Sequence, residues 1–174
     1  MFILTFVANV VVTLISLAVL PSRVAIHYGA NGMANGWAPN YVNALLMTGT
    51  HVLLFCSIYL SSRFMFAYQR MINLPNKEYW LQPAILPQTK EKTSVFMWQI
   101  GIALFLFFIV IGLLSLQANM AKPVRLNEPI LFSALGALLI YTVWWIIMFF
   151  RAFRIPGQRN NPNHQMHNTA HRRQ

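Results

Sequence analysis

The sequence predicts an all-α integral membrane protein with four transmembrane helices, and two observations support this class. First, four apolar stretches contain no Lys, Arg, Asp or Glu, and they occupy residues 1–20, 41–62, 95–116 and 130–150. At about 1.5 Å of helical rise per residue, each stretch would span roughly 30 Å, the thickness of a bilayer core. Second, the chain is 57% hydrophobic and 9% charged, whereas a globular domain in water carries about 25% charged residues.

The positive charges predict how these helices are oriented. Residues 63–94 hold five Lys and Arg and residues 151–174 hold five more, whereas residues 21–40 hold one and residues 117–129 hold two. Basic loops stay in the cytoplasm. We therefore expect both termini inside, a basic cytoplasmic loop, a basic and disordered cytoplasmic tail, two outer loops and a location in the cell (inner) membrane. The net charge of +10 is explained by this topology, so no nucleic-acid partner is expected.

Polar residues inside the apolar stretches mark helix faces that should turn away from lipid. Thr5, Asn9, Thr13 and Ser16 share one face of the first stretch, because they are spaced at i, i+4, i+8 and i+11. The favoured interpretation is hydrogen bonding between helices, and the alternative is a polar pathway. His51 lies near the middle of the second stretch; it is either functional or a neutral imidazole bonded to a facing Asn or Ser.

The outer loop 21–40 is the most patterned connection. Val24, Ile26 and Tyr28 alternate with polar or small residues, which is typical of a short strand. Two Asn-Gly pairs, at 31–32 and 35–36, then signal turns. The loop therefore predicts a compact cap, and His27 is its best candidate for a ligand contact because its pKa normally lies near neutrality. The alternative is a structural histidine.

The same loop resembles a known domain. Leu20-Pro21, His27-Tyr28, Gly32, Asn35 and Trp37 are similar to a bacterial membrane domain of unknown function that also forms the N-terminal part of SdpI-type immunity proteins, which protect against a sporulation-delaying toxin. Ala25 stands where that family usually has proline, and Asn35 stands where Asp is commonest. The resemblance implies a non-enzymatic role in toxin immunity or envelope sensing. The expected contact set for a peptide or other envelope ligand is His27, Tyr28, Asn31, Gly32, Asn35 and Trp37.

The basic loop contains a second motif, which resembles a segment of some short family members. Its prolines rule out one long helix, and its aromatic residues suggest a segment at the inner membrane interface that relays ligand occupancy to a partner. Thr89 is the expected N-cap of the third span. The motif residues are Pro75, Asn76, Lys77, Tyr79 and Trp80.

Catalysis finds little support in the sequence. The only acids are Glu78, Glu91 and Glu128, all outside the apolar stretches, and we expect the first two to pair with neighbouring lysines. No catalytic residue, metal or cofactor is predicted, and the lone Cys56 gives no disulfide. The tail histidines are interpreted as incidental; they are His164, His167 and His171.

Two alternatives to ligand sensing remain open. The chain could be a structural or accessory subunit that meets a membrane protein partner through its polar stripe and through the small residues Ser133, Gly136 and Ala137. It could also be a membrane-embedded, metal-dependent enzyme that uses His27 and His51.

Overall fold

The computed structural model describes residues 1–156 and is mostly helical. Four long helices account for most of the chain: α1 (Phe2–Val19), α2 (Asn40–Phe64), α4 (Leu86–Met120) and α5 (Glu128–Ala152). Each is long and apolar enough to cross a membrane, which confirms the prediction of four helices of membrane-spanning length. The tail histidines at 164, 167 and 171 lie outside the described residues.

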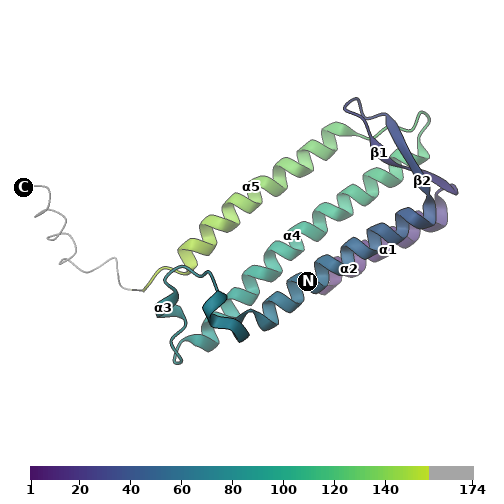
Figure 1. The fold of residues 1–174 in the computed structure, drawn as a ribbon. Helices are drawn as coiled ribbons and strands as arrows, with labels where there is room; N and C mark the ends of the chain where they lie inside the picture. The colour runs from purple at the N-terminus through teal and green to yellow at the C-terminus, as the bar shows by residue number, and fades with distance from the viewer. Residues whose placement is uncertain (157–174) are drawn as a thin grey trace, which may run out of the picture.

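The connections carry the remaining structure. A hairpin of β1 (Arg23–Tyr28) and β2 (Ala34–Pro39) joins α1 to α2, so the fold is not strictly all-α. A 3₁₀ helix, η1 (Met65–Met71), and the one-turn helix α3 (Lys77–Trp80) join α2 to α4. Figure 1 shows the hairpin and the α4–α5 connection at one end of the bundle and α3 at the other.

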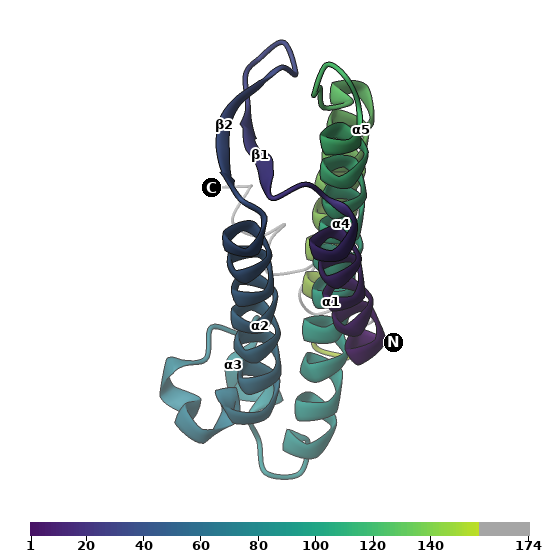
Figure 2. The same ribbon diagram turned by 90° about the vertical axis from the view of Figure 1, so that its right-hand side faces the viewer.

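Three of the long helices pack against one another, and the fourth packs against α4. Contacts join α1, α2 and α4 in all three pairings, whereas α5 packs mainly on α4 (Figure 2). Glycines allow the closest approach: a Cβ at Gly101 would lie 2.6 Å from the Phe2 ring, and one at Gly112 would lie 2.9 Å from Val12. These two contacts show that α1 and α4 run in the same direction.

The polar face of α1 points into the bundle, as predicted. Asn9 and Thr13 are 1% and 7% exposed. Asn9 Nδ2 donates to the carbonyl oxygen of Phe105 on α4 at 2.9 Å, but the hydroxyls of Thr5, Thr13 and Ser16 donate to carbonyls of their own helix. Asn9 alone among the four therefore bridges two helices in the described structure.

Helix α4 begins earlier than the capping prediction places it. It extends beyond the apolar stretch 95–116 at both ends, and its N-cap is Ile85. The prediction that Thr89 caps it is wrong: the Thr89 hydroxyl donates to the carbonyl oxygens of Trp80, at 2.8 Å, and Ile85. Pro87, in the first turn, suits a helix start because proline lacks the amide hydrogen that would be unpaired there.

The predicted motif at residues 75–80 packs against the end of α5, and we use the name clasp for Asn76 and Trp80 of this motif together with Lys92 and Phe153. Trp80 Nε1 and Asn76 Nδ2 both donate to the Phe153 carbonyl oxygen, at 2.7 and 2.8 Å. Lys92 Nζ donates to the Ala152 carbonyl oxygen and lies 4.4 Å from the centre of the Trp80 ring. These bonds satisfy carbonyls that a helix end leaves without partners.

The clasp shows what two of the predicted residues contact. Trp80 is 5% exposed and belongs to an aromatic core with Phe66 and Phe153, so its ring is buried inside the protein; the location of this segment at a membrane interface stays a prediction. Lys92, one of the two lysines expected to pair with Glu91, donates a hydrogen bond to the end of α5 and lies over the Trp80 ring.

Shortening Trp80 tests the clasp. Trp80→Ala is expected to lower the free energy of unfolding by about 3–5 kcal/mol, because it removes a large buried ring. Trp80→Phe should cost only about 0.5–1.5 kcal/mol, because the Phe153 carbonyl keeps its bond from Asn76. Equilibrium unfolding in mixed micelles measures both values. The control is Trp144→Ala, at a half-exposed position on α5; an equal loss for Trp144 and Trp80 would contradict the clasp.

Candidate functional site

The hairpin departs from the simple alternation predicted for it. Val24 pairs with Ala38 and Ala25 pairs with Trp37, but His27 is the next residue to pair, so Ile26 is an extra residue in β1. Such a bulge shifts the side chains that follow to the other face. Val24 and Ala25 are both buried, and Ile26 is exposed. The strand prediction is confirmed, but burial does not follow the alternation of the sequence.

Asn119, near the end of α4, attaches the hairpin to the bundle. Its Oδ1 accepts from the Ala25 amide at 2.6 Å, and its Nδ2 donates to the Ala25 carbonyl oxygen and to the Tyr28 hydroxyl. Burial raises the pKa of the Tyr28 hydroxyl, while side-chain hydrogen bonds with Ser115 and Asn119 act in the opposite direction. Tyr28 therefore stays protonated at neutral pH. One amide side chain thus satisfies both backbone groups of a buried strand residue.

The hairpin turn is held by the connection between α4 and α5. The Leu126 amide donates to the Gly32 carbonyl oxygen at 2.9 Å, and Met33 forms a bridge with Arg125. Gly32 has a φ of +72°, and a Cβ there would lie 2.9 Å from the Leu126 carbonyl oxygen. Asn31 Oδ1 accepts from the Met33 amide. Gly32 and Asn31 therefore shape the turn, and the two loops at this end form one surface.

The other predicted contact residues lie on the hairpin surface. The His27 imidazole bonds to the side-chain oxygen of Asn35, and the missing side chain of Gly36 makes room for His27, because a Cβ there would lie 2.8 Å from the Cβ of His27. Trp37 is 45% exposed. His27 thus has a structural partner and remains at the surface.

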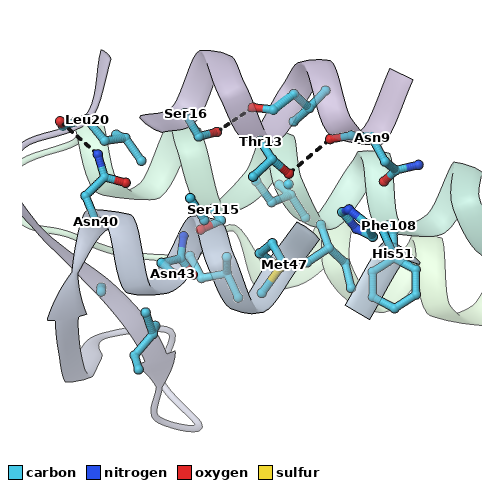
Figure 3. Close-up of a pocket in the computed structure, with 18 of the residues that line it drawn as sticks. Asn9, Thr13, Ser16, Leu20, Asn40, Asn43, Met47, His51, Phe108 and Ser115 are labelled. Atoms are coloured by element: carbon cyan, nitrogen blue, oxygen red, sulfur yellow. Dashed lines mark hydrogen bonds between the residues drawn. The ribbon is translucent and has the colours of Figure 1, made fainter. Parts of the chain in front are cut away.

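A cavity of about 260 Å³ lies beneath the hairpin, between α1, α2 and α4. Figure 3 shows the polar residues of α1 on one side and Asn43, Met47 and His51 of α2 facing them. The hairpin contributes one polar side chain to the cavity lining, the phenol of Tyr28. The polar lining residues on the helices are Asn9, Thr13, Ser16, Asn40, Asn43, His51 and Ser115. The rest of the lining is aliphatic or aromatic, apart from Met47 and Gly112.

Several buried polar atoms beside this cavity have no hydrogen-bond partner within the described structure. They are Asn9 Oδ1, Asn40 Oδ1 and both ring nitrogens of His51. His51 is 3% exposed, and its ring packs edge-on against Phe108 with 5.4 Å between ring centres. The expected hydrogen bond from His51 to a facing Asn or Ser is therefore not formed. Buried polar groups are normally paired, so these atoms make the cavity the candidate site.

The structure brings together only part of the predicted site. Asn9, His51 and Tyr28 line the cavity, although they come from three different elements. His27 does not line it, so the two histidines of the metal-enzyme alternative are not brought to one site. Within residues 1–156 no cluster of three His, Cys, Asp or Glu could hold a metal ion.

Sequence analysis missed Asn40, Asn43, Ser115 and Asn119. Asn40 Nδ2 donates to the carbonyl oxygens of Leu17 and Leu20, and so ties the start of α2 to the end of α1. Two of these residues could have been found from the sequence, because each is an amide side chain at the edge of an apolar stretch. Asn40 directly precedes the second apolar stretch, and Asn119 closely follows the third apolar stretch. Amides at these positions are well placed to satisfy backbone groups of a connecting loop.

The fold and cavity define a helical protein with four helices of membrane-spanning length and a hairpin over a buried polar cavity. Within it, residues 4–50 match a domain of unknown function, DUF1648. This segment covers most of α1, the whole hairpin and the first part of α2, and it includes Asn9, Tyr28 and Asn40. No curated protein and no solved structure matches the chain.

Removing the Asn119 amide tests the attachment of the hairpin. Asn119→Ala leaves the buried Ala25 amide without a partner, so we expect a loss of about 1–3 kcal/mol in unfolding free energy and faster amide exchange across residues 21–40. Hydrogen exchange with mass spectrometry measures the second effect. Gln117→Ala is the matched control, because Gln117 is exposed on the same helix. Unchanged exchange in Asn119→Ala would show that other contacts hold the hairpin.

Proposed function

We propose that this chain is a non-enzymatic, multi-pass protein of the bacterial inner membrane that binds an envelope ligand at its hairpin end. The observation that carries the proposal is the cavity beneath the hairpin, whose buried polar atoms lack partners. The likeness of the hairpin to the N-terminal part of toxin-immunity proteins supports protection against a membrane-active peptide, or sensing of one, as the purpose of binding.

The energetic argument concerns the unpartnered atoms. Each buried polar group without a hydrogen bond costs about 1–3 kcal/mol of stability. Several such groups around one cavity therefore lower the stability of the folded protein. A bound ligand that forms the missing hydrogen bonds would restore that stability. Ligand pockets generally combine apolar walls with a few polar groups that fix orientation, and this cavity has that composition.

The hairpin contributes an exposed surface above the cavity. His27, Asn35 and Trp37 lie on it, while Tyr28 reaches the cavity lining. We propose that an arriving ligand first meets the exposed residues and then the cavity. The clasp at the opposite end of the bundle joins α5 to α4 and supports a second, cytoplasmic role in passing on the bound state to a partner.

A labelling experiment tests the proposed orientation. In a Cys56→Ala background, Asn31→Cys places a single thiol at the exposed hairpin turn. If the hairpin lies outside, a membrane-impermeant thiol reagent should label intact cells. The control is Lys77→Cys in the same background, which should react only after permeabilisation. The reverse pattern would invert the topology and remove the outer-ligand proposal.

A challenge experiment tests the function itself. Cells lacking the protein should be more sensitive than wild type to at least one member of a panel of membrane-active peptides. Asn119→Ala should restore protection less well than Gln117→Ala at equal protein abundance, because it frees the hairpin from α4. Equal sensitivity of deleted and wild-type cells across the panel would refute the protective role.

A role as an accessory subunit is the second candidate, and α5 provides its support. None of the residues of α5 is buried, and the space next to Gly136 is open, since no side chain or other helix of the described structure comes within 4 Å of a Cβ built there. Both features suit a helix that meets another membrane protein. Co-purification of a second chain in mild detergent, and its loss in Gly136→Leu, would favour this candidate.

A further inference from the structure

We infer that the cavity binds an uncharged, unbranched amphiphile, with its hydrogen-bonding head at Asn9 and His51 and its chain extending toward the hairpin. The inference rests on the proposed ligand-binding function and names the chemistry of the ligand. Three features of the cavity lead to it: the placement of its unpartnered atoms, the absence of charged side chains from its lining, and its small volume relative to the length of helix that lines it.

The unpartnered atoms gather at the end of the cavity farther from the hairpin. Asn9 and His51 lie together there, next to Phe108 (Figure 3), and contribute three of the four atoms. Asn9 Oδ1 can only accept a hydrogen bond, whereas a neutral imidazole has one donor nitrogen and one acceptor nitrogen. A single hydroxyl, which both donates and accepts, can therefore bond to both side chains at once.

The lining excludes a charged head. No Lys, Arg, Asp or Glu lines the cavity, and the side chains beside Asn9 and His51 include the rings of Phe105 and Phe108. An ion transferred to such surroundings loses its hydration without gaining a counter-charge, which costs far more than transferring a hydroxyl. An alcohol or a similar neutral head is therefore preferred over a carboxylate, a sulfate or an ammonium group.

The shape suits one unbranched chain. Asn40 bonds to the carbonyls of Leu17 and Leu20, which lie about 12–16 Å along α1 from Asn9 at 1.5 Å per residue. The lining spans this length, yet the volume is about 260 Å³, just below the usual range of roughly 300–1,000 Å³ for small-molecule sites. A two-chain lipid does not fit such a volume. Asn40 lies at the hairpin end of the cavity, which the end of the chain would reach.

His51 provides the variant that separates binding from folding. Within the described structure its nitrogens bond to no protein atom, while its ring packs against Phe105 and Phe108. His51→Phe keeps the aromatic packing and removes two unpartnered polar atoms. We therefore expect an unchanged or higher unfolding temperature without ligand, together with weaker ligand binding. If His51 had only a structural role, His51→Phe would lower the unfolding temperature of the ligand-free protein.

The experiment compares three probes that share a ten-carbon chain and differ only in the head: decan-1-ol, decyl sulfate and decyltrimethylammonium. Purified full-length protein in nanodiscs is titrated with each probe at equal mole fraction in lipid, and the unfolding midpoint is followed, since a ligand of the folded state raises it. Decan-1-ol should bind about ten-fold more tightly than either charged probe, and His51→Phe should remove about that factor, the effect of one lost hydrogen bond. The control is Leu53→Phe, at an exposed site on α2, which should bind like wild type.

The outcomes separate the ligand class from the proposed function. Equal shifts from all three probes, or a decan-1-ol shift unaffected by His51→Phe, would overturn the inference. No shift from any probe, with stable His51→Phe protein, would mean that the cavity holds water, and would also overturn it. Protection in the peptide challenge would still stand in both cases. Binding of decan-1-ol only after lipid has been washed from the protein supports a resident single-chain, neutral lipid as the source, and binding without washing supports an external ligand of the same chemistry.

Discussion

The contact between the Asn119 side chain and Ala25 is the interaction on which the candidate site depends. A bulged two-stranded hairpin is marginally stable alone. Without Asn119, the backbone amide and carbonyl of the buried residue Ala25 would lose the partners that they have on α4. The Asn119 amide supplies both a donor and an acceptor to that residue, and it also bonds to the Tyr28 hydroxyl. Because Asn119 is on α4, the hairpin is held directly above the space between α1, α2 and α4.

The three-helix cluster divides into an aromatic part and a polar part. Near the start of α1, the Phe2 ring stacks on Phe55, packs against Phe105 and lies against Gly101, and these rings fill the interior. Toward the hairpin, Asn9 and Thr13 replace these rings on the inward face of α1, and the interior is no longer filled. The boundary lies at Asn9, whose amide group bonds to the Phe105 carbonyl while its oxygen is left for the cavity.

The two ends of the bundle differ in the side chains that bond to free backbone groups. Each connection must satisfy backbone groups that helix ends leave unpaired. At one end side-chain amides do this: Asn119 for the hairpin and Asn40 for the end of α1. At the other end Trp80, Asn76 and Lys92 bond to the last carbonyls of α5. The first arrangement leaves a cavity, whereas the second buries an aromatic core with Phe153 at its centre.

The sequence by itself determined the four helices, because runs of about twenty apolar residues without charge are long enough to form membrane-spanning helices. It also determined the inward face of α1, through the spacing of Thr5, Asn9, Thr13 and Ser16, and the presence of a strand at residues 23–28. Only the tertiary structure decided which residues meet. Asn9, Tyr28 and His51 line one cavity because three helices and a hairpin converge there, and no periodicity within one element encodes that convergence. The bulge at Ile26 and the roles of Asn119 and Trp80 were hidden for the same reason: each depends on a hydrogen-bond or packing partner more than 70 residues away in the chain or on pairing with another strand.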